Sequence, residues 1–373
     1  MPCPRSATAP TRVTNALRFV GGVISHYYYD DYPLPPLAEQ QRIVAKVDEL
    51  LALCDELDHR QTHRQTVRVA TETAALHALT TADSPAALGE AWTRVRTHWS
   101  ALTAHPTSVP PLRQAILQLA VQGKLVPQDA SDEPASELLK RIAAEKARLV
   151  KAKEIREPKP LPPIDSEGLP FAVPEWWEWC RLGELILDGP TNGYSPRAVE
   201  GPTPVKSLLL SATTSGTFDP AHSKFIDEEV ADGSPLWLRP GDFLVQRSNT
   251  EEYVGVSAVF TGGLREFIYP DLIMRFRPTS LIYASFLHYA MNSPSMRDYL
   301  RSKARGTSKS MVKINQIALR SSPIPTPSLA EQQRIVAKVD ELMALCDELE
   351  THLTQQETTA THLATAAVQT LAS

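Results

Sequence analysis

Residues 37–58 read LAEQQRIVAKVDELLALCDELD, and residues 329–350 read LAEQQRIVAKVDELMALCDELE. We call these segments the first repeat and the second repeat, and they differ only at Leu51/Met343 and Asp58/Glu350. Their separation is far larger than the roughly 20–50 residues of a solenoid period. The duplication therefore involves a whole module, or two ends of the chain that do the same task.

Both repeats have the apolar periodicity of long packed helices. Apolar residues recur at alternating steps of four and three, beginning with Ile43 and Val47 in the first repeat and with Ile335 in the second. That spacing is a heptad seam. Neither proline nor glycine interrupts residues 37–82 or 329–373, and proline-rich segments precede both. We therefore expect two long helices, with Cys54 and Cys346 as small buried residues of the apolar faces.

A coiled-coil oligomerisation element would explain the seam alone. It would not explain why the polar residues at the two helix starts, which we expect to be exposed, are identical. Matching surfaces indicate that each helix start binds a copy of the same partner. The residues concerned are Glu39, Gln40 and Arg42 in the first repeat and Glu331, Gln332 and Arg334 in the second.

Length and composition indicate a globular protein of several domains. The chain has 373 residues, of which 42% are hydrophobic and 22% charged. The formal net charge is −5, but the acidic excess belongs to the repeats, and the remainder is mildly positive. No stretch has the roughly 18 apolar residues of a membrane span, and the N-terminus lacks a signal-peptide core. We therefore expect a cytoplasmic location.

The segment between the repeats divides at a proline-rich linker, PKPLPP, at residues 158–163. Two helices are expected before it. Pro111 suits the first turn of one and Gly123 its C-terminal cap, while Asp132 or Ser131 is the candidate N-cap of the other. After the linker, up to about Ser322, short strands with tight turns are expected in residues 236–248, 252–263 and 267–278, and helices at 282–291 and 295–305. This pattern predicts a mixed α/β domain. Residues 83–109 suggest no role.

Catalytic signatures are missing from the sequence. It contains no P-loop, no glycine-rich dinucleotide motif and no H-E-x-x-H, and its four cysteines form no C-x-x-C pair. We therefore expect no catalytic residue, metal or cofactor. The sequence favours a binding module whose partners carry out the reactions.

The mixed domain offers three segments suited to nucleic acid. Residues 301–320 hold six basic residues and no acid, in what we interpret as a small, flexible loop for phosphate contact. Two further loops carry the residue types that pair with base edges. The candidates are Asn192, Tyr194, Ser195 and Arg197 in one loop, Gln246, Arg247 and Asn249 in the other, and Arg301, Lys303, Arg305, Thr307, Ser308, Lys309, Lys313 and Asn315 in the basic segment.

These segments resemble, in order, those of type I restriction–modification specificity subunits. LPFAVPEWWEWCRLGEL is similar to the start of a target-recognition domain, and GDFLVQRSN and YVGVSAVF to its middle. GTSKSMVKINQIALRSSPIPTPSLAEQQRIVAKVDEL is similar to its end. LRQAILQLAVQGKLVPQD, followed by DEPASELLKRIAAEK, is similar to the segment that precedes such a domain.

The resemblance implies a fold and a set of partners. The expected fold class is α+β, a mixed α/β target-recognition domain flanked by two long helices that form an antiparallel coiled coil. Such a subunit is non-catalytic and binds double-stranded DNA. Two methyltransferase (modification) subunits, which methylate adenine, bind its helices, and a motor-nuclease (restriction) subunit completes the complex.

The chain departs from the family pattern at its N-terminus. Where the family has a whole domain, residues 1–35 are similar only to the tail of one, so the chain resembles a truncated or half-type subunit. It could pair with a second copy as a homodimer, or it could be an inactive remnant. A non-catalytic scaffold or adaptor is the alternative, followed by an unrecognised single-chain enzyme. The expected organisation is a remnant at 1–35, helix at 36–82, connector at 83–163, recognition domain at 164–324 and helix at 325–373.

Overall fold

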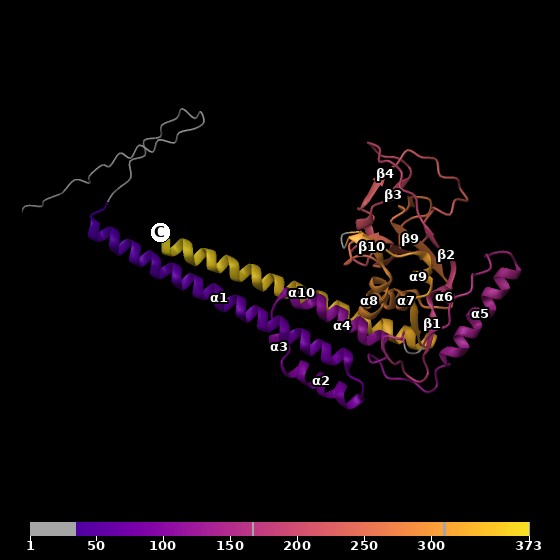
Figure 1. The fold of residues 1–373 in the computed structure, drawn as a ribbon, viewed down its shortest axis with the longest axis horizontal. Coiled ribbons are helices and arrows are strands. Elements are labelled where there is room, and N and C mark those ends of the chain that lie inside the picture. Colours follow the sequence, from indigo (N-terminus) through magenta and orange to yellow (C-terminus); the bar gives the residue numbers. More distant parts are fainter. Residues whose placement is uncertain (1–34, 166–167, 309–310, 373) are drawn as a thin grey trace, which may run out of the picture. The chain divides into compact units, whose positions relative to one another are not determined.

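The computed structural model describes residues 35–165, 168–308 and 311–372, with side-chain detail omitted for residues 307–308 and 371–372 (Figure 1). Helices and short strands alternate in the middle of the chain, and a long helix lies toward each end. The expected α+β class with two long helices is therefore confirmed. By its contacts the chain divides into two units, residues 1–70 and 71–373. The antiparallel pairing of the long helices stays a prediction.

Helix α1 (Leu37–Thr81) contains the first repeat. Pro36 O accepts hydrogen bonds from the backbone N–H groups of Glu39 and Gln40, which fixes the helix start. The apolar seam is exposed in the first unit, and Val47 retains 47% of its accessible surface. Cys54 is exposed as well. The expected burial of Cys54 is thus wrong, because a helix cannot cover a stripe of its own side chains.

The connector is helical. The last turns of α1 pack through Leu79 against α2 (Pro85–Thr97) and α3 (Trp99–Leu102). A 3₁₀ turn, η1 (Pro106–Ser108), leads into α4 (Val109–Val121). Gly123 follows α4 with a φ of 67°, the left-handed conformation expected of a C-terminal cap. The predicted end of this helix is confirmed.

Helix α5 (Ala135–Lys151) begins differently from the prediction. Its N-cap is Pro134, without a side-chain cap. Asp132, one of the two predicted caps, instead accepts hydrogen bonds from Arg334 and Ser328. An ion pair with a distant arginine has displaced the local cap, which sequence spacing alone cannot foresee. The apolar face of α5 is buried as expected.

The mixed domain is built on four small sheets, with antiparallel pairing throughout except between β3 and β8. The strand runs predicted from sequence are confirmed in β5, β7 and β9. The sheets are β2 (Ile186–Asn192), β9 (Ile273–Pro278), β5 (Phe243–Gln246) and β7 (Ser257–Val259); β4 (Ser223–Phe225), β3 (Lys206–Leu208) and β8 (Phe267–Ile268); β10 (Arg305–Ser308), β11 (Met311–Lys313) and β6 (Ser248–Asn249); and β1 (Glu178–Arg181) with β12 (Pro323–Thr326).

Helices cover the core of this domain. The expected helices near residues 282–291 and 295–305 are α7 (Ala284–Asn292) and α8 (Pro294–Lys303). Phe243 and Phe276 stack at the centre, with ring centroids 4.9 Å apart. Short helical turns occur at α6 (Leu182–Leu185), η3 (Leu210–Thr213) and α9 (Gln316–Arg320). The basic segment is therefore a helix end, the hairpin β10–β11 and α9, and not the loop predicted from sequence.

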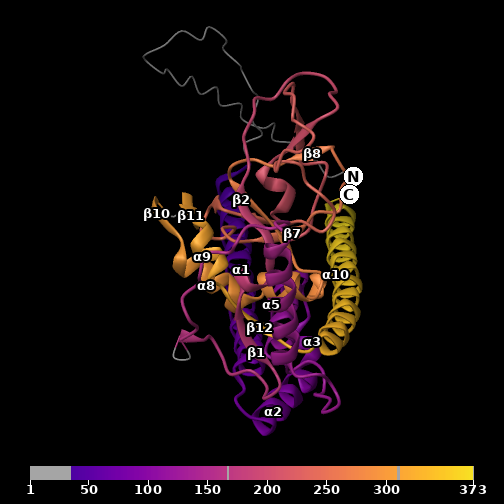
Figure 2. The same ribbon diagram turned by 90° about the vertical axis from the view of Figure 1, so that its right-hand side faces the viewer.

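Helix α10 (Leu329–Ala372) contains the second repeat and packs on α4. β1 and β12, the first and last strands of the mixed domain in sequence, pair with each other (Figure 2), and α10 begins three residues after the end of β12. Ile335, Val339 and Cys346 are buried against Ile116 and its neighbours in α4. The expected burial of Cys346 is confirmed. Among the described helices, none is both long and apolar enough to cross a membrane.

Candidate nucleic-acid interface

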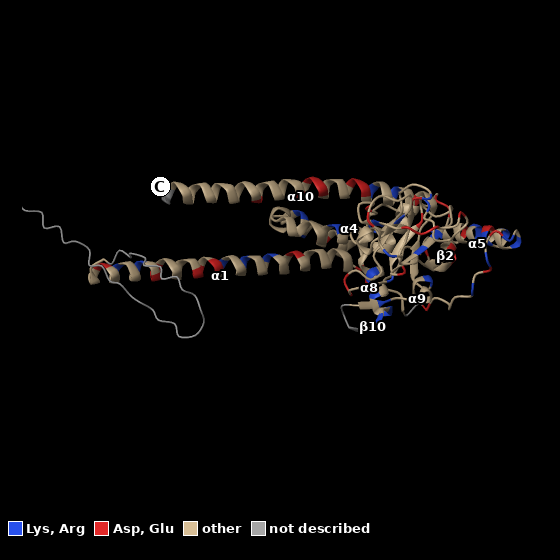
Figure 3. Cartoon of the chain, turned by 90° about the horizontal axis from the view of Figure 1, so that it is seen from above, with Lys and Arg blue, Asp and Glu red and all other residues tan. Residues whose placement is uncertain are grey.

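The sheet of β6, β11 and β10 joins two of the three segments singled out in the sequence. Lys313 lies opposite Ser248, and Val312 lies opposite Asn249. The backbone N–H of Ile314 also donates to Arg247 O at 3.0 Å. The basic hairpin and the loop around Arg247 thus form one continuous surface, on the side of the domain that carries α8 and α9 (Figure 3).

The third segment meets this surface at Asp271. Ser195 Oγ donates to Asp271 Oδ1 at 2.5 Å, and Arg247 Nη1 donates to Asp271 O at 3.3 Å. Gly193 allows its own backbone to lie close to the backbone of Tyr269, because a Cβ at this position would lie 1.9 Å from Tyr269 O. Asp271, which sequence reasoning missed, therefore joins the loops of Ser195 and Arg247, and the basic segment joins the same surface through Arg247 and β6.

Several side chains of this surface remain available to a ligand. Within the described residues, the side chains of Asn192 and Arg197 are exposed and form no hydrogen bond or ion pair. Tyr194 is also exposed, and its hydroxyl donates to Glu228 Oε1 at 3.3 Å. An amide, a phenol and a guanidinium on one loop can pair with base edges or phosphate oxygens.

Gln246 does not have the exposed position that the sequence suggested. Its side chain is fully buried, and Nε2 donates to the hydroxyls of Thr213 and Thr214 at 3.1 Å. Asn249 Nδ2 in turn donates to Gln246 Oε1 at 2.7 Å, while its own Oδ1 accepts from Thr250 N. The expected exposure of Gln246 is wrong, because its amide holds the loop together from inside. A contact between Gln246 and DNA bases stays a prediction. Asn249 is half-buried in the same network.

The basic candidates differ in their surroundings. Arg301 pairs with Asp298 at 3.0 Å and donates to the carbonyls of Glu251 and Glu252. Arg305 donates to the carbonyls of Ser302 and Ala304. Lys303 and Lys313 are exposed. Lys309 and the side chains of Thr307 and Ser308 lie outside the described residues.

Asn315 has a local structural task. Its Oδ1 accepts a hydrogen bond from the backbone N–H of Ala318 at 2.7 Å and so caps α9. The sequence placed Asn315 among the nucleic-acid candidates of the basic segment. A cap at this position sets where α9 begins, directly after the hairpin.

A buried arginine that the sequence analysis did not notice supports the same surface. Arg297 of α8 donates to Val254 O at 2.5 Å and to Glu252 O at 2.8 Å. Burial, and then the charge of Arg301, lower the pKa of Arg297 to about 10. Sequence gave no signal, because an arginine on a short polar helix is normally exposed.

The polar residues at the start of the second repeat form hydrogen bonds with other parts of the same chain. Glu331 and Gln332 are 2% and 0% exposed. Glu331 accepts hydrogen bonds from Trp177 Nε1 at 2.9 Å and from Gln128 Nε2 at 2.6 Å. Gln332 Oε1 accepts from the backbone N–H of Tyr283 at 2.8 Å. The expected exposure of Glu331 and Gln332 is therefore wrong, because they join α10 to the mixed domain.

Arg334 lies at the edge of the same contact and pairs with Asp132 at 2.6 Å. The matching residues of the first repeat have none of these partners in their own unit. There, Gln40 Nε2 donates to Pro35 O at 2.8 Å, and Glu39 and Arg42 are exposed. Identical sequence thus occurs in two environments.

Comparison with known proteins gives a consistent result. The family model described as "Type I restriction modification DNA specificity domain" matches residues 238–357. The chain is 35% identical over 351 residues to the type I restriction enzyme EcoEI specificity subunit of Escherichia coli. It is 34% identical over 367 residues to the EcoAI specificity subunit of the same species. These alignments cover 91% and 92% of this chain but only 58% of each relative.

Among solved structures, the chain is similar to the HsdS subunit from Thermoanaerobacter tengcongensis. It is 18% identical, with a TM-score of 0.36, and the match covers 90% of this chain and 62% of that one. With 58% of each of the two Escherichia coli subunits covered, the chain spans little more than half the length of the curated relatives it matches.

Proposed function

Since this chain belongs to the family of type I restriction-enzyme specificity subunits, we propose that it recognises a specific sequence in double-stranded DNA. The observation that carries the proposal is the convergence of three separate segments around Asp271, Arg247 and β11. Loops that rigid strands hold in place, with exposed amide and guanidinium groups, suit the reading of base edges.

The residues divide into two tasks. Asn192, Tyr194 and Arg197, with Arg247, contact base edges, while Ser195 positions their loop. Phosphate contacts fall to Lys303, Arg305 and Lys313, with Lys309 between them in the sequence. Three acidic residues, Glu251, Glu252 and Asp271, border this surface. The basic residues must therefore attract the DNA phosphates against the repulsion of these carboxylates.

The chain acts without catalytic residues of its own and directs other subunits to the DNA. In this proposal a methyltransferase subunit modifies adenine, and a motor-nuclease subunit restricts unmodified DNA. Glu39, Gln40 and Arg42 at the start of α1, of which Glu39 and Arg42 are exposed, bind such a partner in the cytoplasm. Residues 164–324 form the recognition domain, and a second copy of the chain supplies the other half of a bipartite reader.

Salt-dependent binding to duplex DNA tests the proposal. The triple variant Arg305→Ala, Lys309→Ala, Lys313→Ala should bind more weakly, and its plot of log affinity against log salt should flatten by about 0.9 for each lost phosphate contact. Arg96→Ala on α2 removes an exposed arginine far from these strands in sequence and serves as the control. If the triple variant and the wild type show the same slope, the assignment of these residues is wrong.

A further inference from the structure

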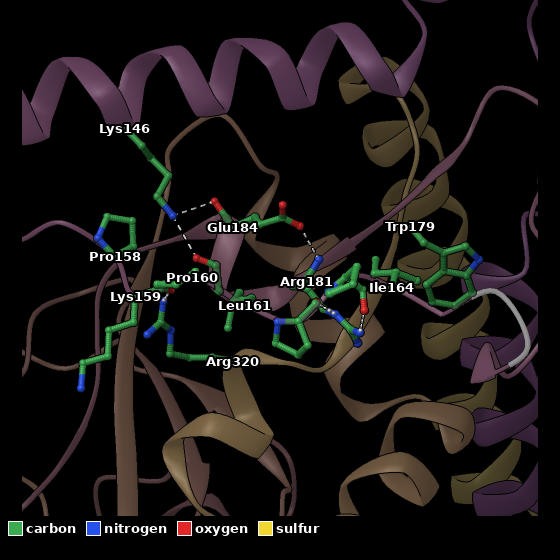
Figure 4. Close-up of a pocket in the computed structure, with 13 residues that line it drawn as sticks. Lys146, Pro158, Lys159, Pro160, Leu161, Ile164, Trp179, Arg181, Glu184 and Arg320 are labelled. Carbon is green, nitrogen blue, oxygen red and sulfur yellow. Dashed lines mark hydrogen bonds between the residues drawn. The ribbon is translucent and has the colours of Figure 1, made fainter.

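A concave pocket of about 470 Å³ lies between α5, β1, α9 and the proline-rich linker (Figure 4). Cationic side chains reach it from four places in the chain. They are Lys146 of α5, Lys159 of the linker, Arg181 of β1 and Arg320 of α9. The one carboxylate among the lining residues is Glu184, whose Oε2 accepts from the backbone N–H of Arg181 at 2.6 Å.

The cations of the pocket are bonded to backbone carbonyls and not to carboxylates. Within the described part of the chain, Lys146 Nζ donates to Gly183 O at 2.9 Å and to Glu184 O at 3.0 Å. Arg181 donates to the carbonyls of Pro162, Pro163 and Ser321, so it fastens the linker to the mixed domain. Carbonyl groups satisfy N–H donors, but they do not neutralise the positive charge.

This positive charge remains partly uncompensated inside the pocket. Lys146 is only 9% exposed. Burial first, and then the nearby charge of Arg320, lower the pKa of Lys146 to about 8. Two cations that oppose each other's ionisation are stabilised when an anion enters between them.

Arg320 keeps donors for such an anion. Of its five N–H groups, the described structure uses one, from Nη2 to Lys159 O at 3.0 Å. Gly183 allows the guanidinium to lie close to the chain, because a Cβ there would lie 3.2 Å from Arg320 Nε and 2.7 Å from Leu161 Cδ1. Glycine thus leaves room for the charged group at the pocket wall.

We infer that this pocket binds a phosphate group, with Arg320 and Lys146 as its cationic ligands. Arginine and lysine donate charge-assisted hydrogen bonds to phosphate oxygens, and arginine does so in a bidentate manner. A backbone phosphate of DNA and a free phosphate compound share this chemistry. The DNA backbone is favoured, because Arg320 is the last residue of the basic segment 301–320, whose helix α9 follows the hairpin β10–β11 after only Ile314 and Asn315. That version rests on the proposed function.

Calorimetric titration with inorganic phosphate tests the pocket without DNA. Arg320→Gln removes the charge but keeps an amide N–H for Lys159 O, so the linker contact can persist. We expect it to bind phosphate at least tenfold more weakly than the wild type, with Arg320→Lys in between. The matched control Arg96→Ala should bind as the wild type does, and thermal unfolding verifies that each variant is folded.

Duplex DNA binding at several salt concentrations identifies the source of the phosphate. Loss of about 0.9 from the salt slope in Arg320→Gln assigns the pocket to the DNA backbone. An unchanged slope together with lost phosphate binding assigns it to a free phosphate compound. Equal phosphate binding by wild type and Arg320→Gln, with an unchanged slope, overturns the inference. If the wild type binds phosphate but does not bind duplex DNA, the proposed function is wrong and the assignment of the pocket as a phosphate site still holds.

Discussion

Trp177 Nε1 donates a hydrogen bond to Glu331 Oε2 at 2.9 Å, and this bond ties the mixed domain to the start of α10. Glu331 is nearly inaccessible, and burial raises the pKa of its carboxyl group despite the hydrogen bonds it accepts. Glu39, the same residue of the first repeat, is exposed. The pair therefore offers an internal comparison of one side chain in two settings.

Glu331→Ala should destabilise the fold by roughly 1–3 kcal/mol, because it leaves the buried indole N–H of Trp177 without an acceptor and removes the acceptor of Gln128. Glu331→Gln keeps an acceptor oxygen and should cost much less. Glu39→Ala is the matched control and should leave stability unchanged. Urea unfolding of the three variants measures this, and an equal effect of the two alanine substitutions would contradict the contact.

The thiols should react in the order that their burial dictates. In a Cys3→Ser background, maleimide should label Cys54 in the native protein, while Cys180 and Cys346 should react only after denaturant is added. Burial raises the pKa of Cys180 to about 12 and also raises that of Cys346, so little thiolate forms on either. Mass spectrometry after short exposure identifies the labelled site. Cys54→Ser must abolish the fast reaction, and rapid labelling of Cys346 in the folded chain would disprove the packing of α10.

The two amide candidates of the recognition surface should behave in opposite ways. Gln246→Ala should lower stability by roughly 1–3 kcal/mol, since Asn249 and two threonine hydroxyls lose a buried partner. Asn192→Ala should leave stability unchanged and weaken binding to the cognate DNA. Thermal unfolding and DNA titration on both variants separate the two roles. A stable Gln246→Ala protein with altered sequence preference would restore the interpretation made from sequence.

Stability should fall in mildly acidic solution because of His288. Its Nε2 donates to Gly216 O at 2.8 Å and to Ser257 O at 3.2 Å, and burial lowers the pKa of the imidazole. The unfolded chain therefore takes up the proton first, and stability is lost as the pH falls below the unfolded value of about 6.5 toward the lowered one. His288→Gln should flatten this dependence, whereas the exposed His222→Gln should not. Unfolding curves between neutral and acid pH decide the matter.

Sequence pattern predicted the long helices, the helix end at Gly123 and strands β5, β7 and β9, because these depend on local pattern and conformation. It failed where distant groups decide. Asp132 pairs with Arg334 instead of capping α5. The side chain of Gln246 points inward because it donates hydrogen bonds to the hydroxyls of Thr213 and Thr214. Nothing near Gln246 in the sequence marks those partners.

The candidate site shows the same division. Exposed Asn192, Arg197 and Lys313 were identified by residue type alone. Asp271, which connects two loops through Ser195 and Arg247, was not, since aspartate is one of the residues that are common in turns. The importance of Asp271 comes from its contacts with Ser195 and Arg247, which only the tertiary structure shows.

The unequal environments of the two repeats have a practical consequence for immunochemistry. An antibody raised against the peptide AEQQRIVAKVDEL, which both segments contain, finds its epitope open on α1 but closed on α10, where Ile335, Val336 and Val339 face the interior. On the native chain such a reagent has one site to bind, and on the denatured chain it has two. The ratio of antibody binding on the native chain to that on the denatured chain would report whether α10 is packed against the mixed domain.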